Sequence, residues 1–171
     1  TPTLCCENGE DTVTDSDKLC SLRWDDERGM AAIIDQRLLP HTLEWCYLDS
    51  LEAYCFAISE MQVRGAPLIG VTAAFGLAHA LAQDSSDENL ANASRALLAT
   101  RPTAVNLRWA LEQVASVVRD VPAAERATVA HDKAVLLRKE DIANCERIGN
   151  NGLDVLRGLG RNRLDIMTHC N

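Results

Sequence analysis

Residues 62–81 read Gln-Val-Arg-Gly-Ala-Pro-Leu-Ile-Gly-Val-Thr-Ala-Ala-Phe-Gly-Leu-Ala-His-Ala-Leu, and they are the most informative part of the chain. From Pro67 to Leu81 the residues are apolar on nearly every face of a helix, which predicts a buried helix. Gly70, Ala74 and Ala78 lie four positions apart and form a stripe of small side chains. Small side chains allow neighbouring helices to approach closely. We therefore expect this segment to be the core helix.

The start of this helix has the features of an anion-binding site. Arg64 and Gly65 precede Pro67, and proline is tolerated in a first helical turn because its missing N–H would have no intrahelical partner there. The free amides, the positive end of the helix dipole and the guanidinium of Arg64 together would form a cradle for one phosphate. A plain helix start explains the same residues, so both interpretations stay open at this point.

The rest of the chain also favours helix packing, since its apolar content is mostly Ala, Leu, Val and Ile and only 4% of its residues are aromatic. Two runs, 21–25 and 30–36, flank a turn-rich tetrapeptide and predict a β-hairpin. The fold class is therefore mostly α with a small N-terminal β-hairpin or sheet. The predicted helices run from an Asp49–Glu52 capping box to Arg64, from Ser86 to Thr100, from Leu107 to Pro122, and over 124–156 with a candidate break at 150–152.

Beyond residue 157 the pattern changes from helix to strand. Gly158 and Gly160 predict a turn, and residues 164–168 form a short apolar run typical of a strand. A buried parallel strand needs neighbours, so we expect this run to begin a truncated α/β, Rossmann-like domain; the alternative is a strand that adds to the N-terminal hairpin. The predicted divisions are a disordered or non-native leader (1–20), a helical domain with its hairpin (21–157) and the start of the truncated domain (158–171).

The overall charge limits the ligands that the chain can bind. A net charge of -8 and a pI near 4.9 argue against a general nucleic-acid surface or a surface for anionic membranes. Any phosphate must therefore be held by a few local arginines. No apolar run approaches the roughly 18 residues of a membrane span, and the acidic N-terminus does not fit a signal peptide. We expect a soluble, cytoplasmic protein with neither nucleic-acid nor membrane partners.

Seven cysteines are scattered without a Cys-x-x-Cys pair, which supports neither a disulfide framework nor a zinc site. Cys170 stands out because it follows the predicted strand, and catalytic side chains collect at such strand ends. A buried structural cysteine is the alternative. Among the histidines, we expect His79 to lie in the core, His131 to lie on a solvated charged helix face and His169 to be structural.

Four blocks of sequence together resemble one family, and the second and fourth are specific when found together. The blocks are Asp35-Gln36-Arg37-Leu38-Leu39-Pro40, Met61-Gln62-Val63-Arg64-Gly65-Ala66-Pro67-Leu68-Ile69-Gly70, Thr100-Arg101-Pro102-Thr103-Ala104-Val105-Asn106-Leu107 and Met167-Thr168-His169-Cys170-Asn171. On these blocks, residues 23–171 resemble the 5-methylthioribose-1-phosphate isomerases of methionine salvage. Those enzymes belong to a broader group that includes the regulatory subunits of translation initiation factor 2B.

The resemblance implies an aldose–ketose isomerase that converts 5-methylthioribose 1-phosphate into 5-methylthioribulose 1-phosphate, with no metal or organic cofactor. It implies that Arg64, Gly65, Ala66 and Arg101 contact the substrate, and that Cys170 stabilises the transition state or moves the proton. It also implies a homodimer and an aspartate proton donor beyond the last residue, so the chain alone is expected to be inactive. The alternatives are an isomerase of a related pentose phosphate and a non-catalytic sugar-phosphate-sensing or scaffold subunit, like those of initiation factor 2B.

Overall fold

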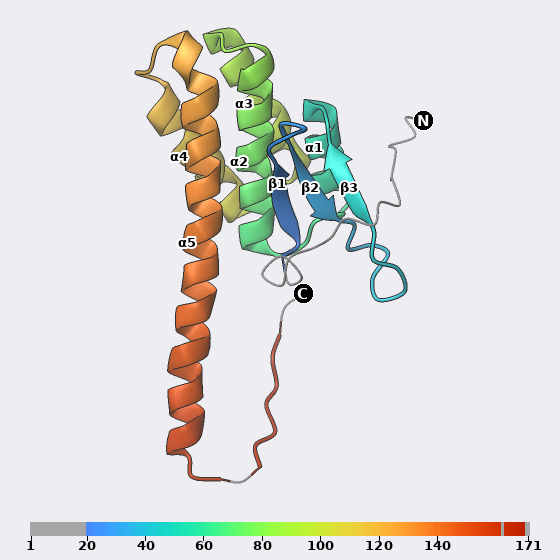
Figure 1. Cartoon of the computed structure of the whole chain (residues 1–171), viewed down its shortest axis with the longest axis vertical. Coiled ribbons are helices and arrows are strands. Elements are labelled where there is room, and N and C mark those ends of the chain that lie inside the picture. Colours follow the sequence, from blue (N-terminus) through green and yellow to red (C-terminus); the bar gives the residue numbers. More distant parts are fainter. Residues whose placement is uncertain (1–19, 162, 170–171) are drawn as a thin grey trace.

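The computed structural model of the chain describes residues 20–161 and 163–169. These residues form five helices and one three-stranded sheet, which confirms a mostly α fold with a small sheet (Figure 1). Apart from its last residue, the predicted leader, 1–20, lies outside the described residues. The strands are β1 (Leu22–Asp25), β2 (Met30–Ile34) and β3 (Trp45–Leu48), and the helices are α1 (Leu51–Ser59), α2 (Ala66–Gln83), α3 (Asp87–Thr100), α4 (Val105–Val118) and α5 (Ala123–Gly158).

The three strands form an antiparallel sheet in the order β1-β2-β3. The predicted hairpin is confirmed, because Asp25 pairs with Met30 across the turn. The sequence reasoning missed β3. Its signal is the alternation along the strand, in which Cys46 and Leu48 are buried and the two intervening residues are partly exposed. This alternation turns one face of the sheet toward the helical core.

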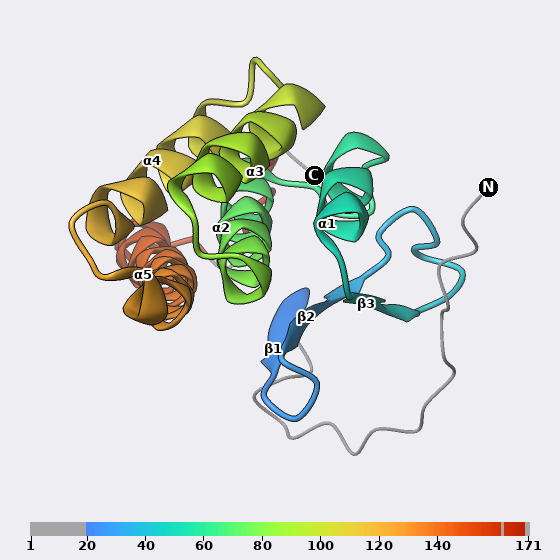
Figure 2. The ribbon, with the colours of Figure 1, turned by 90° about the horizontal axis from the view of Figure 1, so that it is seen from above.

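α2 is the central helix of the domain, as predicted. Viewed from above, the other four helices are arranged around it and the sheet lies beside it (Figure 2). A Cβ added at Gly76 would lie 3.0 Å from the side chain of Tyr54 in α1, so these two helices pack closely. Contrary to the sequence expectation, α2 is long and apolar enough to cross a membrane by length and composition alone. Within the protein, however, 72% of this helix is buried, as a core helix requires.

The helix ends follow local sequence signals with three corrections. α1 ends at Ser59, five residues before the predicted end at Arg64, and Met61 has a φ of 56°, outside the helical region. Ser86 caps α3 as predicted, and its hydroxyl accepts a hydrogen bond from a first-turn amide. α1 is capped by Ser50 instead of Asp49, because the Ser50 hydroxyl is the group that accepts from the first turn. α5 continues through residues 150–152 without a break. A single glycine costs a helix only about 1 kcal/mol, so it does not have to end one.

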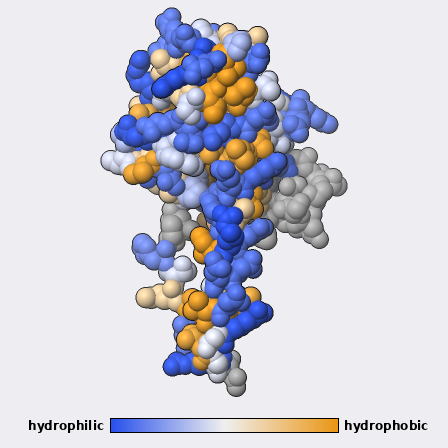
Figure 3. Space-filling model, turned by 90° about the vertical axis from the view of Figure 1, so that its left-hand side faces the viewer, coloured by the Kyte–Doolittle hydropathy of each residue, from blue (hydrophilic) through white to orange (hydrophobic). Residues whose placement is uncertain are grey.

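The second half of α5 projects beyond the rest of the domain (Figure 1). The buried residues of α5 all lie between 126 and 137. Farther along, apolar side chains are exposed among charged ones, as on Ile148 (71% exposed) and Val155 (67% exposed), and apolar groups gather near the lower end of the helix in Figure 3. Only the first half of α5 therefore belongs to the core.

The two histidines of the helices have different surroundings. His79 is 7% exposed, and its ring lies 5.6 Å from the ring of Tyr54, which confirms a core histidine. The prediction for His131 was wrong, because its ring lies 4.5 Å from that of Trp24 and 6.0 Å from that of Phe75. These aromatic residues come from β1 and α2. The charged composition of α5 does not reveal that they reach this face.

Residues 163–169 form neither helix nor strand and are mostly exposed. The strand expected over 164–168 is therefore not formed in the structure. A strand needs a hydrogen-bonded neighbour, and none of the described residues pairs with this run. The alternative in which the run joins the N-terminal sheet is wrong for the same reason. Cys170 lies outside the described residues.

Candidate functional site

The backbone in front of α2 leaves the start of this helix open. Gly65 is the N-cap and has a φ of 94°, a value that residues with a side chain rarely adopt. No side chain caps the helix, and Pro67 stands in its first turn. Arg64 is exposed directly before it, and its side chain makes no hydrogen bond or ion pair with another described residue. Uncapped first-turn amides beside an arginine favour an anion.

A second arginine precedes α4 in a similar way. Residues 101–104 form a turn, closed by a hydrogen bond of 3.0 Å from the Ala104 N–H to the Arg101 carbonyl oxygen. Ala104 is the N-cap of α4 and offers no side-chain hydrogen bond, so the first turn of α4 is also uncapped. Arg101 is partly exposed. The start of α4 is therefore also uncapped and also follows an arginine, which lies three residues before its N-cap.

The two helix starts are neighbours in space. Gly70, in the second turn of α2, packs against the backbone of Asn106, in the first turn of α4. An added Cβ at Gly70 would lie 2.8 Å from the Asn106 carbonyl oxygen. Both helices therefore direct the positive end of their dipoles toward the same end of the bundle.

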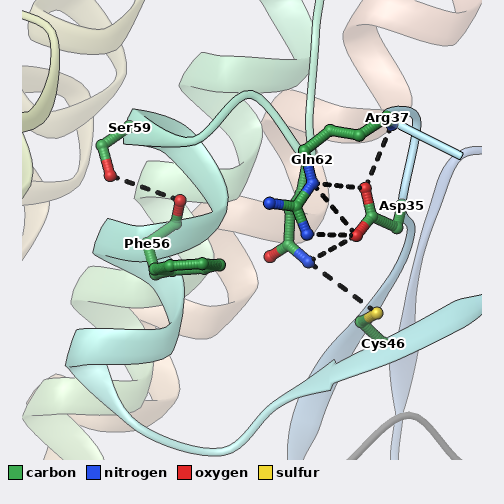
Figure 4. A network of polar contacts seen from close by, with 6 residues as sticks. All are labelled: Asp35, Arg37, Cys46, Phe56, Ser59 and Gln62. Atoms are coloured by element: carbon green, nitrogen blue, oxygen red, sulfur yellow. Dashed lines mark hydrogen bonds and ion pairs between the residues drawn. The ribbon is translucent and has the colours of Figure 1, made fainter. Parts of the chain in front are cut away.

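A network around the buried side chains of Asp35 and Gln62 ties the segment before α2 to the residues that follow β2 (Figure 4). The Asp35 carboxylate accepts hydrogen bonds from Arg37, with Nε 2.9 Å from Oδ1 and Nη2 2.6 Å from Oδ2. The side-chain amide of Gln62 donates to Oδ2 of Asp35 at 2.8 Å. In addition, the backbone N–H of Gln36 donates to the Gln62 carbonyl oxygen at 2.9 Å. Because Gln62 is two residues before Arg64, this network constrains the segment that carries Arg64.

The network holds Asp35 as a carboxylate although it is only 2% exposed. Burial opposes its charge, but the hydrogen bonds from Arg37 and Gln62 outweigh burial and lower the pKa of Asp35 below its ordinary value. The same carboxylate raises the pKa of Arg37. Residues 35–40 and 61–70 are separate blocks in the sequence, and their contact was not predicted. No local pattern reveals a pair 27 positions apart.

A cavity of about 740 Å³ lies beside the two helix starts, between α2, α4 and α5. Pro67, Gly70 and Trp109 line its α2 and α4 side, while Asp141 and Arg147 line its α5 side. Burial raises the pKa of the Asp141 carboxyl. A space of this volume, with apolar groups facing polar ones, is of the size that binds small molecules. Within residues 20–161 and 163–169, no three His, Cys, Asp or Glu side chains gather in a way that could hold a metal ion.

The structure brings four of the five predicted site residues to one end of the helical bundle. Arg64, Gly65 and Ala66 stand at the start of α2, and Arg101 stands before the neighbouring start of α4. None of the four lines the cavity itself, whose α2 wall begins at Pro67 and whose α4 wall begins at Val105. Cys170, the fifth, lies outside the described residues, so its position relative to the others stays a prediction.

Comparisons with known proteins agree with the four sequence blocks. The model of the initiation factor 2 subunit family matches residues 62–171. The chain is 46% identical over 154 residues to methylthioribose-1-phosphate isomerase of Methylocella silvestris, an alignment that covers 86% of this chain and 42% of that protein. It is 47% identical over 154 residues to an uncharacterised protein from the petC 3′ region of Rhodospirillum rubrum, with 85% of this chain and 84% of that protein covered.

Two solved structures have the same fold. Translation initiation factor eIF-2B subunit delta from A. fulgidus superposes with a TM-score of 0.65 and 32% identity, over 71% of this chain and 37% of that one. 5-Methylthioribose 1-phosphate isomerase from Pyrococcus horikoshii gives 0.64 and 32%, over 70% and 36%. This chain spans about two fifths of the length of the isomerases that it matches. Since the family model covers more than half of the chain, the chain belongs to the initiation factor 2 subunit family.

Proposed function

We propose that this chain forms the phosphate-binding part of an aldose–ketose isomerase, which converts 5-methylthioribose 1-phosphate into 5-methylthioribulose 1-phosphate in methionine salvage. The observation that carries the proposal is the contact between Gly70 and Asn106, because it brings together two uncapped helix starts that each follow an arginine. The similarity to methylthioribose-1-phosphate isomerases supports the choice of substrate.

In this proposal the phosphate lies at the start of α2. The N–H of Ala66 donates to a phosphate oxygen, and Gly65 allows the backbone to approach because it has no side chain. The guanidinium groups of Arg64 and Arg101 pair with the remaining charge. Hydrogen bonds to a charged group contribute about 1.5–3 kcal/mol each. A few such bonds hold the anion even though the chain carries a net charge of -8.

The phosphate on C1 defines the chemical problem, because it prevents the sugar ring from opening to a free aldehyde. Hydrogen must therefore move from C2 to C1 by another route. In one route a base removes the C2 proton while an acid protonates the ring oxygen, the bond between C1 and the ring oxygen breaks, and the proton is then returned to C1. In the other route the same bond breaks and a hydride passes directly from C2 to C1. Cys170 is assigned to proton movement or to stabilising the transition state, and the acid is expected to be an aspartate, both as the resemblance implies.

The remaining expectations about the whole protein belong to the same proposal. Residues 158–171 begin a Rossmann-like domain, the protein is a cytoplasmic homodimer, and it uses no cofactor. Neither nucleic acid nor a membrane is a partner. An isomerase acting on a related pentose phosphate would use the same phosphate site and differ in the pocket for the 5-substituent.

A second candidate function is that of a non-catalytic sensor of sugar phosphates. Its specific support is the fold shared with translation initiation factor eIF-2B subunit delta from A. fulgidus. A sensor needs the arginines at the two helix starts but does not need Cys170. The two functions therefore predict the same binding and different effects of changing that cysteine.

Binding is tested by calorimetric titration of ribose 1-phosphate into the chain and its variants. Arg64→Ala and Arg101→Ala are each expected to weaken binding by about 10-fold or more, the loss of one charge-assisted contact. Arg95→Ala is the matched control, because Arg95 is an exposed arginine of α3 that bonds only locally, to Asn92. Equal affinities for all four proteins would exclude the phosphate site.

Turnover is tested with a chimera that joins this chain to the C-terminal part of the Rhodospirillum rubrum isomerase, to which it is 47% identical over 154 residues. The chimera is expected to isomerise 5-methylthioribose 1-phosphate, whereas the 171-residue chain alone is expected to show no turnover. Cys170→Ala in the chimera should abolish turnover and leave binding intact. A chimera that binds the substrate without converting it would favour the sensor.

A further inference from the structure

We infer that Asp35, together with Arg37 and Gln62, is a positioning group for the phosphate site: the buried carboxylate holds the segment that presents Arg64 and the first amides of α2. This inference rests on the proposed function, since it assigns to the network a part in binding the sugar phosphate. None of the three side chains is assigned a contact with the substrate.

Hydrogen bonds of Gln62 and Val63 fix the chain before α2. The Gln62 side chain is bonded to Asp35 at 2.8 Å, and its backbone carbonyl accepts from the Gln36 N–H at 2.9 Å. The next amide, that of Val63, donates to the Ala57 carbonyl oxygen at the end of α1 at 3.2 Å. The segment is therefore held from β2 on one side and from α1 on the other, immediately before Arg64.

The backbone that these bonds surround has a positive φ at two positions. Met61 has a φ of 56° and Gly65 a φ of 94°, so the chain is in the left-handed region on both sides of Gln62, Val63 and Arg64. A non-glycine residue in this region costs about 1–2 kcal/mol. Such a conformation persists only where surrounding contacts determine it. The Asp35–Gln62 bond is one of those contacts.

A glutamine at position 62 is not what stability alone would favour. Gln62 is 2% exposed, and its Oε1 has no hydrogen-bond partner among the described residues; in Figure 4 it points away from Asp35. A buried polar atom without a partner is unfavourable. An apolar side chain of similar size would fill the space without this cost. The amide does what an apolar side chain cannot do, which is to orient the segment by its bond to the carboxylate.

The Asp35 carboxylate is itself held in place by two contacts of Arg37. Arg37 binds both oxygens of Asp35, and the Arg37 guanidinium lies over the ring of Phe56 in α1, 5.6 Å from its centre. A bidentate pair fixes direction as well as distance. The position of Gln62 is therefore fixed relative to both the end of β2 and α1. The same contacts restrict the position of Arg64.

The first experiment measures order in the segment without any ligand. In Asp35→Asn and in Gln62→Leu, hydrogen exchange at the Gln36 and Val63 amides should become about 10-fold faster or more, because the bond that holds their segment is lost. The amide of Ala74 in α2 should keep its rate. Asp25→Asn is the matched control, since Asp25 forms a similar pair with Arg28 on the hairpin, with Nη1 2.9 Å from Oδ2. Unchanged exchange in both network variants would overturn the inference.

The second experiment separates positioning from general destabilisation by a double-mutant cycle with ribose 1-phosphate as the probe. Asp35→Asn is expected to weaken binding by about 10-fold in the wild-type background and by about 3-fold or less in the Arg64→Ala background, because the part of its effect that acts through Arg64 is already lost there and only the effect on the α2 amides remains. Equal losses in the two backgrounds would contradict the inference. If Arg64→Ala weakens binding and Asp35→Asn does not, the positioning role is wrong and the phosphate site stands. If Arg64→Ala itself has no effect, the proposed function fails first.

Discussion

Gly70 and Asn106 are in backbone contact where α2 and α4 begin: a Cβ added at Gly70 would lie 2.8 Å from the Asn106 carbonyl oxygen and 3.3 Å from the Cβ of Ala110. The contact depends on residue 70 having no side chain. It sets the distance between the two helix starts that follow Arg64 and Arg101. A residue that contacts no ligand in our proposal therefore shapes the candidate phosphate site.

Gly70→Ala should lower the free energy of unfolding by about 1–3 kcal/mol, because the added methyl overpacks against backbone that cannot rotate away. The change should also weaken ribose 1-phosphate binding. Gly149→Ala is the matched control, since Gly149 lies in α5 with no atom within 4 Å of an added Cβ. The control should be stabilised by about 0.5–1 kcal/mol through helix propensity. Urea unfolding measures both, and stabilisation of Gly70→Ala would show that the helices do not meet in this way.

Gly65→Ala should cost about 1–2 kcal/mol of stability, because its φ of 94° is unfavourable for a residue with a Cβ. Gly29→Ala, at φ 64° in the hairpin turn, should have a cost of similar size. The two variants differ in binding, since only Gly65 stands at the phosphate site. Calorimetry with ribose 1-phosphate should show a weaker affinity for Gly65→Ala alone. A comparable loss of affinity in Gly29→Ala would mean that overall stability, and not the backbone conformation at Gly65, controls binding.

Ser50→Ala should destabilise the chain by about 0.5–2 kcal/mol, the usual cost of removing an N-cap. The Ser50 hydroxyl accepts a hydrogen bond from the Ala53 amide at 3.3 Å. The Asp49 side chain accepts no such bond from the first turn of α1. Asp49→Ala should therefore change the stability by no more than about 0.5 kcal/mol. Thermal unfolding followed by circular dichroism compares the two. A larger effect at Asp49 would restore the capping box that the sequence suggested.

Acid should remove a stabilising contribution of Asp35. Its pKa in the folded chain lies below the ordinary value of 3.8, so folding favours the ionised form. This contribution is complete above the ordinary pKa and is lost as the pH falls through the lower folded pKa. Asp35→Asn should consequently be less stable than the wild type near neutral pH, and its stability should fall less steeply below about pH 4.

Asp141 should show the opposite behaviour, because burial raises its pKa. Protonation of this carboxyl favours the folded chain, so Asp141→Asn should make the acid loss of stability steeper. Urea titrations between about pH 6 and about pH 2 measure both variants. Parallel curves for the wild type and Asp35→Asn would contradict the pairing of the buried Asp35 carboxylate with the exposed Arg37.

Helical periodicity and caps predicted the elements that depend on local chemistry. The core helix after Pro67, the Ser86 cap and the hairpin turn between Asp25 and Met30 are all confirmed. Each of them is specified by neighbours within one or two turns of the chain. Arg64 and Arg101 were singled out for the same reason, because they stand beside local helix-start signals, and their role in binding stays a prediction.

The contacts that the sequence reasoning missed join residues far apart in the chain. His131 was expected in solvent but packs against Trp24 and Phe75. The bond between Asp35 and Gln62 is likewise invisible in either block alone. Neither residue type nor spacing reveals such partners, since they depend on how the sheet and α1 are placed around α2.

Propensity, periodicity and capping act over a few residues, so they predicted most of the helix positions, the buried helix and the arginines that precede helix starts. The contact between the starts of α2 and α4, and the bond of a buried carboxylate to the segment before α2, are seen only in the folded chain. Both follow from close packing between distant segments. The physical reason is that a missing side chain at Gly70 and a charge at Asp35 acquire their effect only from the neighbours that folding brings to them.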